Sequence, residues 1–324
     1  MTTALESLSP LLSPLPLIRA GEHAAAMTIN RAWRGGRFVR VVPGVYVDAD
    51  AWRTSPPWEQ YVAKVRAVAA TRPDTIFSHR AAAALRGVVI GGPSQLVHII
   101  DMTGTSRRNA NVRIYTSRDH RDLVSLDGIT ATSVADTVVD IARTTPSAEG
   151  LAFADALLRT TTGLTSDVLQ AVNETRSSSR NRDHARWALS RATGKPESVL
   201  ESLSLAAIEW SGLAIPEVQT RFRTEGKEDR ADFFWPSVPL IGEADGLAKY
   251  SGAFRDAPEA IAAEKDRESR LRRNIGPVVR WGWDDVSTPH RLGRLLRAAG
   301  VPVAGQPQEA RLRTLISLGR ERRL

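Results

Sequence analysis

The chain has 324 residues, 42% of them hydrophobic, and a formal net charge of +8 at pH 7. This length predicts two or three globular domains, each large enough for its own core, and the basic balance favours an anionic partner such as DNA. The absence of cysteine excludes disulfides, thiolate zinc sites and cysteine nucleophiles. Residues 1–17 lack a basic start and an unbroken apolar core, and no run reaches about 18 apolar residues, which predicts a cytoplasmic protein.

The first segment, 1–50, predicts a winged helix-turn-helix. Short helices over 20–26 and 29–34, the second capped by Thr28, precede a hairpin over 37–47. In such a module Arg31 and Arg34 would face the major groove of DNA. Arg37 and Arg40 would meet its phosphates. The alternative is a small core motif whose arginines are merely solvated.

The next segment, 51–172, predicts a middle α/β region. Helices are expected over 58–71, 78–87 and 132–142, and strands over 97–101 and 112–115, with a polar, basic loop at 104–109. Ser78 and His79 suggest a nucleophile and a base, but adjacent residues at a helix start point in different directions. We therefore expect His79 to be structural or to face DNA. Asp136 and Asp140 lie one helical turn apart.

Two stretches of the N-terminal half resemble the AbiEi-type antitoxins of abortive-infection systems. Gly36-Arg-Phe-Val-Arg-Val-Val-Pro-Gly-Val-Tyr46 is similar to the hairpin of their N-terminal winged helix. Ser78-His-Arg-Ala-Ala-Ala-Ala-Leu-Arg-Gly87 is similar to a stretch of their linker domain. The resemblance implies a regulator that binds an operator in DNA and has a toxin protein as partner.

A linker and helix are expected over 173–192. Asn173-Glu-Thr-Arg-Ser-Ser-Ser-Arg-Asn-Arg182 is polar and serine-rich, which indicates a surface loop or linker. Asp183 is the expected N-cap of a helix over 184–192.

The segment 193–300 predicts a domain with the order α-β-β-β-α-β-α. Its elements are expected at 196–212, 217–223, 230–235, 240–245, 258–275, 277–283 and 289–299. The connection between the last two strands is long enough for a parallel, right-handed crossover. Trp281 and Trp283 alternate along the last strand, so both are expected on one face as core.

Acidic residues gather in the middle of this segment. Glu243 and Asp245 are two apart on one strand and so share a side, and pairing with the preceding strand can bring Asp232 beside them. Carboxylates in one place repel each other unless a cation lies between them, and hard oxygen ligands suit Mg²⁺ or Mn²⁺. The alternative is that these acids are solvated on an exposed face of the sheet.

Residues 196–299 resemble the PD-(D/E)XK nuclease superfamily, and within it the very-short-patch-repair-like endonucleases of an actinobacterial type. The matching residues include Ser198-x-x-Glu201, Gly212-Leu-x-x-Pro216-Glu-x-Gln219, Asp232, Glu243-x-Asp245-Gly246, Lys249-Tyr250 and Glu264-Lys-x-Arg-Glu268. The resemblance implies that Asp232, Glu243 and Glu201 bind Mg²⁺ or Mn²⁺. Asp245, which stands where the superfamily usually has a lysine, would be an accessory ligand, and Lys249 or Lys265 would orient water or stabilise the phosphate.

The last segment, 301–324, predicts a basic C-terminal tail that holds phosphates without reading sequence, or else a solvated terminal helix. The whole chain then predicts a DNA-binding, metal-dependent endonuclease that hydrolyses phosphodiester bonds, in DNA repair or phage defence. The alternative is an antitoxin-type transcriptional regulator whose nuclease-like fold is catalytically inactive.

Overall fold

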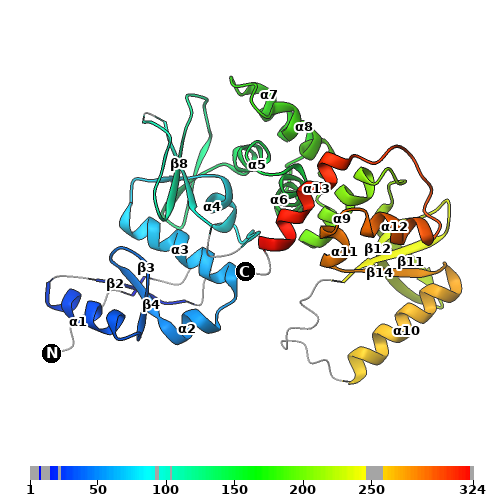
Figure 1. The fold of residues 1–324 in the computed structure, drawn as a ribbon, viewed down its shortest axis with the longest axis horizontal. Coiled ribbons are helices and arrows are strands. Elements are labelled where there is room, and N and C mark those ends of the chain that lie inside the picture. The colour runs from blue at the N-terminus through cyan, green and yellow to red at the C-terminus, as the bar shows by residue number, and fades with distance from the viewer. Residues whose placement is uncertain are drawn as a thin grey trace. The chain divides into compact units, whose positions relative to one another are not determined.

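The structure, a computed structural model, describes residues 7–8, 15–20, 23–91, 95–102, 104–245 and 258–321. The chain is a mixed α/β protein with several sheets and forms two compact units (Figure 1). Unit 1 comprises Met1–Thr144 and Asp167–Arg186, and unit 2 comprises Thr145–Ser166 and Trp187–Leu324. In the described part of the chain, no helix is both long enough and apolar enough to cross a membrane.

Unit 1 begins with a small sheet of order β1-β2-β4-β3 beside one helix. Its elements are β1 (Ser7–Leu8), β2 (Leu17–Arg19), α1 (His23–Arg34), β3 (Phe38–Val42) and β4 (Val45–Asp48). The predicted hairpin is confirmed, because β3 and β4 pair in antiparallel fashion. The two predicted helices are wrong: α1 is continuous, and Thr28 lies inside it. A run of alanines before Thr28 favours helix more strongly than Thr28 favours a cap.

A second sheet, of order β7-β8-β6-β5-β10-β9, forms the rest of unit 1 together with several helices. Its elements are α2 (Ala49–Thr54), α3 (Pro57–Thr71), β5 (Ile76–Phe77), α4 (His79–Ala84), β6 (Val97–Asp101), β7 (Arg107–Arg108), β8 (Val112–Thr116), β9 (Leu123–Leu126), β10 (Ile129–Thr132), α5 (Val134–Ala142) and α7 (Ser166–Thr175). One apolar cluster reaches from Leu15 to Ala131, so both sheets share a core. The predicted loop at 104–109 contains the short strand β7.

The stretch expected as a linker is only partly a surface loop. Residues 177–181 are exposed, but Asn173 is buried within α7, and Arg176 is only 4% exposed. The guanidinium of Arg176 pairs with Asp136, and that of Arg121 donates to both oxygens of Asp140, at 2.9 and 3.0 Å. The two acids of α5 are therefore buried structural partners of arginines, a pairing over long sequence distance that no local pattern reveals.

Between residues 196 and 299 unit 2 follows the predicted order of elements, with one additional short helix after the last strand, and it also contains a helix over 147–160 that the sequence does not predict. The elements are α6 (Ser147–Thr160), α9 (Val199–Trp210), β11 (Glu217–Thr224), β12 (Lys227–Trp235), β13 (Leu240–Ala244), α10 (Pro258–Asn274), β14 (Val278–Trp281), α11 (Trp283–Ser287), α12 (Arg291–Ala298) and α13 (Glu309–Glu321), and α8 (Arg182–Arg191) spans the unit boundary. The sheet order is β11-β12-β13-β14, and β13 and β14 are parallel as expected. Strand β14 ends at Trp281, earlier than predicted, and Trp283 is the first residue of α11. The Asp285 carboxylate accepts the Gly282 N–H at 2.9 Å and so caps the start of this helix.

Helices α9 and α10 lie on opposite sides of this sheet (Figure 1). On the α9 side, Trp281 is buried and its indole N–H donates to Ser204 of α9 at 2.8 Å. On the α10 side, Leu271 of α10 packs with Ile241 of β13. Because side chains alternate along a strand, residues two apart from Ile241 share the α10 side, and these include Glu243.

The chain from residue 301 onward contains a packed helix within its described part. Leu312, Leu315 and Leu318 of α13 are buried, and the Arg311 guanidinium lies 5.3 Å from the centre of the Trp187 ring. The buried leucines show a docked helix, so within its described part the segment is neither a tail nor a merely solvated helix. Arg322 and Arg323 lie outside the described residues.

Candidate functional site: a buried acidic pair on the sheet of unit 2

Asp232 and Glu243 come together where the β12–β13 ladder ends. Phe233 and Gly242 form the last pair of this antiparallel ladder, and Asp232 and Glu243 are the residues that directly follow it on the two adjacent strands. The Ala244 N–H donates to the Asp232 carboxylate at 3.0 Å. Glu243 is buried and Asp232 is half-buried. Of the three acids expected to converge, Asp232 and Glu243 do so, whereas Asp245 contacts Arg280.

Both carboxyl groups of this pair have raised pKa values. Burial, and after it the charge of Glu201, raises the pKa of Asp232 to about 6. Burial, and after it the charge of Asp232, raises the pKa of Glu243 to about 7. The charge of Asp232 therefore disfavours the negative charge of Glu243, and Glu201 disfavours that of Asp232, so a bound proton or cation stabilises the group.

Gln219 connects the acidic pair to Glu201. The Gln219 side-chain N–H donates to the Glu201 carboxylate at 2.7 Å, and its nitrogen lies 3.4 Å from an Asp232 oxygen. The backbone of Gln219 has a φ of 57°, in the left-handed region that glycine favours. Its amide oxygen is buried and has no hydrogen-bond partner in the described part of the chain. Strain and an unused buried acceptor at one residue are typical of a functional site.

Glu201 is held at the start of α9. Its backbone N–H donates to the Ser198 hydroxyl at 3.2 Å, and its carboxylate accepts the Glu197 N–H at 2.9 Å, in a capping arrangement. With Gln219 between them, Glu201 and Asp232 interact through the amide. The structure thus brings Glu201 to the edge of the acidic pair and joins it to the pair through Gln219.

The cation that faces the pair is Arg267 of α10. Its Nη1 donates to Glu243 at 3.3 Å and to the Arg230 carbonyl oxygen at 2.8 Å. Its Nε and Nη2 donate to the two carboxylate oxygens of Glu264, at 2.8 Å each. Hydrogen bonds from Arg267 and Arg280 hold the pKa of Glu264 down at about 2.

Asp245 turns towards a different partner than the acidic pair. Arg280 Nη1 donates to Asp245 at 3.0 Å, and Arg280 Nη2 contacts Glu264 and Glu268 at 2.9 Å each. Asp245 therefore belongs to an ion-pair network with Arg280. Lys265 is exposed on α10, and Lys249 lies outside the described residues.

The donor set of the pair fits a hard divalent cation. In the described residues, no three His, Asp or Glu side chains form a group that could hold a metal ion. Mg²⁺ keeps several waters and is commonly bound by one or two carboxylates together with a substrate phosphate. Asp232 supplies a half-buried carboxylate and Glu243 a buried one, both with raised pKa values, and the amide oxygen of Gln219 is a third oxygen without a hydrogen-bond partner in the described residues.

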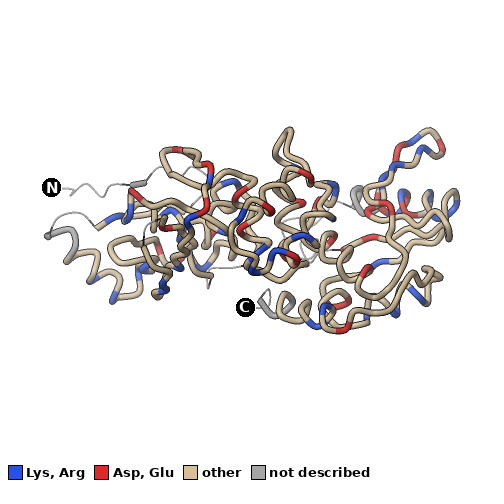
Figure 2. Tube along the Cα trace, turned by 90° about the horizontal axis from the view of Figure 1, so that it is seen from above, with Lys and Arg blue, Asp and Glu red and all other residues tan. Residues whose placement is uncertain are grey.

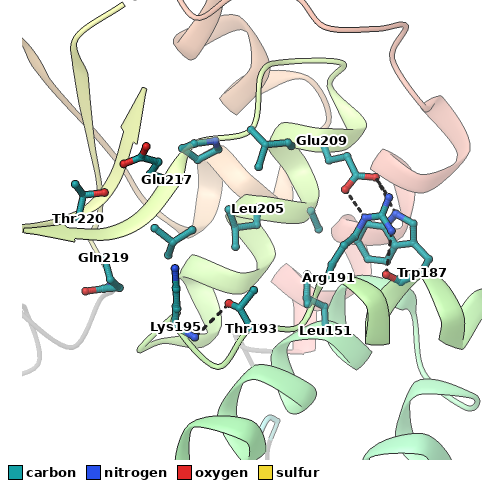
Figure 3. A pocket seen from close by; sticks show the side chains of 14 residues that line it. Leu151, Trp187, Arg191, Thr193, Lys195, Leu205, Glu209, Glu217, Gln219 and Thr220 are labelled. Atoms are coloured by element: carbon teal, nitrogen blue, oxygen red, sulfur yellow. Dashed lines mark hydrogen bonds and ion pairs between the residues drawn. The ribbon is translucent and has the colours of Figure 1, made fainter. Parts of the chain in front are cut away.

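A cavity of about 650 Å³ lies along β11 in unit 2. Figure 3 shows Gln219 and Thr220 of β11 at one end, and at the other Glu209, whose carboxylate is held by Arg191 and by the Trp187 indole. The walls between these ends are largely apolar. Because Gln219 both lines this cavity and contacts the acidic pair, the two features adjoin.

The four arginines singled out near the N-terminus are all exposed, on α1 and around β3 of unit 1. The Arg40 guanidinium lies 4.3 Å from the centre of the Trp33 ring, which fixes its direction. Figure 2 shows that basic and acidic residues are interleaved along the chain in both units. The exposed arginines are thus available to a partner.

His79 is structural. It is 4% exposed and stacks on Tyr115 with ring centres 3.9 Å apart, and its Nδ1 is 2.9 Å from the Ser78 hydroxyl. Burial, and after it the charge of Arg121, lowers the pKa of His79 to about 3, so the ring is neutral. Because the ring is enclosed, it does not face DNA.

Reasoning from the sequence missed two residues of the site. Gln219 belongs to the Gly212–Gln219 motif, but the sequence of that motif does not show that the Gln219 backbone turns its side chain towards Glu201. Arg267 was passed over in favour of Lys265. The available signal was the spacing of three between Glu264 and Arg267, which places them on one helix face, whereas Lys265 and Arg267 point in different directions.

Unit 2 is therefore an α/β unit with a buried acidic pair on a four-stranded mixed sheet. No family model matches the chain. It is 30% identical over 198 residues to the uncharacterized proteins MT2308 of Mycobacterium tuberculosis (strain CDC 1551 / Oshkosh) and Rv2248 of Mycobacterium tuberculosis (strain ATCC 25618 / H37Rv). The match covers 60% of this chain and 70% of each relative. The chain belongs to the same family as these two proteins.

Proposed function

We propose that unit 2 is a metal-dependent endonuclease domain of the PD-(D/E)XK type that hydrolyses phosphodiester bonds in DNA. The observation that carries the proposal is the buried pair Asp232 and Glu243 with raised pKa values on adjacent strands. The order helix, three strands, helix and parallel strand is the order expected of such a domain.

In this proposal, Asp232 and Glu243 hold Mg²⁺ or Mn²⁺, which supplies a Lewis acid for the phosphate and an activated water. Gln219 fixes the orientation of Asp232, and Glu201 fixes Gln219. The cavity beside Gln219 gives room for part of the substrate. The exposed arginines of unit 1 bind the DNA backbone, consistent with the net charge of +8.

A second candidate is an antitoxin-type regulator, in which unit 1 binds an operator and unit 2 is an inactive scaffold. Two observations favour it. Arg267 already provides a positive charge at Glu243, and Asp245 stands where a lysine would be expected and is paired with Arg280. In this case the acidic pair has no catalytic role, and a toxin protein is the expected partner.

Cleavage of supercoiled plasmid and of short duplexes with Mg²⁺ or Mn²⁺ separates the two. We expect cleavage by the wild type, loss of cleavage in Asp232→Ala, and unchanged DNA binding by fluorescence anisotropy. Glu228→Ala, which removes an exposed acid from the same strand, is the matched control. No cleavage with either ion, combined with tight binding to the DNA upstream of its own gene, would establish the regulator instead.

A further inference from the structure

Arg267 is held in a fixed place beside the acidic pair. Leu271, one turn further along α10, is buried against the sheet, and Arg270 forms a bidentate contact with the buried Asp229 of β12 at 2.6 and 2.9 Å. The Arg267 side chain itself is 22% exposed. Its guanidinium is therefore positioned by the helix and does not reach Glu243 by chance.

The contacts of Arg267 are unequal. It makes two short, parallel hydrogen bonds to Glu264 but one long contact, 3.3 Å, to Glu243. Charge-assisted hydrogen bonds weaken with distance, and a bidentate pair is the stronger arrangement. When the two contacts compete, the one to Glu243 breaks first and Arg267 stays with Glu264.

We infer that Arg267 is a resident counter-ion of the acidic pair. A divalent cation displaces its guanidinium from Glu243, and the guanidinium stays bound to Glu264. The inference rests on the proposed function and adds to it the control of metal binding. A guanidinium and a metal ion cannot both take the same Glu243 oxygen, and two positive charges at close range repel each other. Arg267 thereby weakens metal binding, and Glu264 limits that weakening because it holds the guanidinium back.

The test is the affinity of the full chain for Mn²⁺, measured from the electron paramagnetic resonance signal of the free ion at low salt and pH 8. We expect Arg267→Gln to bind Mn²⁺ about tenfold more tightly than the wild type. We expect Glu264→Gln to bind it more weakly, because the guanidinium is then left to Glu243. Arg273→Gln, which removes an exposed arginine of the same helix, is expected to match the wild type.

Opposite changes in the two variants cannot both come from partial unfolding, and thermal unfolding confirms that each variant is folded. Equal affinities in the wild type and Arg267→Gln, both abolished by Asp232→Asn, would overturn the inference and leave the metal site in place. If none of the proteins binds Mn²⁺, the metal site of the proposed function is absent and the inference is lost with it.

Discussion

The acidic pair of unit 2 makes stability depend on pH at the scale of single residues. The pKa values of Asp232 and Glu243 in the folded state, about 6 and about 7, lie above their ordinary values of 3.8 and 4.5. Below about pH 3 both groups are protonated in the folded and unfolded states, so the stability they confer does not change with pH there. As the pH rises through 4 to 7 the unfolded chain releases these protons more readily, so folding stability is lost.

Asp232→Asn is therefore expected to be more stable than the wild type at pH 8, by roughly 2 kcal/mol, and about equal to it at pH 3. The amide keeps the shape of the carboxyl group and cannot ionise. Urea unfolding at the two pH values, with divalent ions chelated, measures the difference. Glu228→Gln removes an exposed carboxylate whose pKa is lowered by Arg221 and Arg223, so it should be no more stable than the wild type at pH 8. An Asn variant of Asp232 less stable than the wild type at pH 8 would contradict the assignment.

The acids of the site could be predicted from the sequence, whereas their neighbours could not. Period-two alternation brings Glu243 to the side of the sheet where Asp232 lies, and that reasoning needs only strand geometry. The roles of Gln219 and Arg267 depend on one unusual backbone angle and on the reach of a side chain from another element. Neither the backbone angle of Gln219 nor the reach of Arg267 can be predicted from the local hydrophobic pattern.

At the scale of the element, buried ion pairs hold α5 in unit 1. The side chains of Arg121 and Asp140 are 7% and 4% exposed. Arg121→Ala would leave a buried carboxylate without its partner, and we expect a loss of about 3 to 5 kcal/mol in the free energy of unfolding. Denaturant unfolding measures it.

The matched control for this pair is Arg53→Ala, which breaks the exposed pair with Asp50 on α2. A loss below about 1 kcal/mol is expected there. Similar losses in the two variants would show that burial does not decide the strength of these contacts.

The end of α9 depends on a glycine. Gly212 has a φ of +70°, and a Cβ there would lie 2.3 Å from the Gly305 carbonyl oxygen. We expect Gly212→Ala to destabilise the protein by more than about 3 kcal/mol, since backbone strain and a clash with backbone add together.

Gly226→Ala separates these two causes. Gly226 has a φ of +72° but nothing within 4 Å of the added carbon, so it should cost about 1 kcal/mol. Thermal or urea unfolding compares the two variants, and equal losses would show that the approach of Gly305 is harmless.

Most elements were predictable because their apolar periods are clear, as in α3, β6 and the strands of unit 2. The sequence does not predict α6, α7, β9 or β10. Two further errors fall where two local signals compete. At Thr28 a capping residue follows helix-forming alanines, and at Trp283 strand-like alternation runs into a helix capped by Asp285. In both places the sequence offers two structures, and the stronger local signal decides between them.

At the scale of the whole molecule, the proposal places DNA binding and cleavage in different units. Arg37→Ala with Arg40→Ala is expected to weaken DNA binding and to make the slope of log K against log salt shallower by about 2. Titration by anisotropy at several salt concentrations measures the slope. Arg53→Ala, in the same unit, is the control, and an unchanged slope would exclude phosphate contacts by these arginines.

How the chain is shared between the two units could not be predicted from the sequence. The chain leaves unit 1 after Thr144, returns at Asp167 and leaves it again after Arg186. Helices α6 and α7 each have an apolar face, but an apolar face does not say which core will cover it. That choice depends on contacts between residues far apart in the chain.

Strand β11 lies at the edge of its sheet, where unpaired backbone groups can recruit a strand from another molecule. Pairing with β12 is interrupted at Gln219, and Glu217, Arg221 and Arg223 carry charge along the exposed side. The irregularity that turns the Gln219 amide towards the acidic pair therefore also breaks the template on which an intermolecular sheet would grow. We expect this irregularity and these charges to oppose strand pairing between molecules at high concentration.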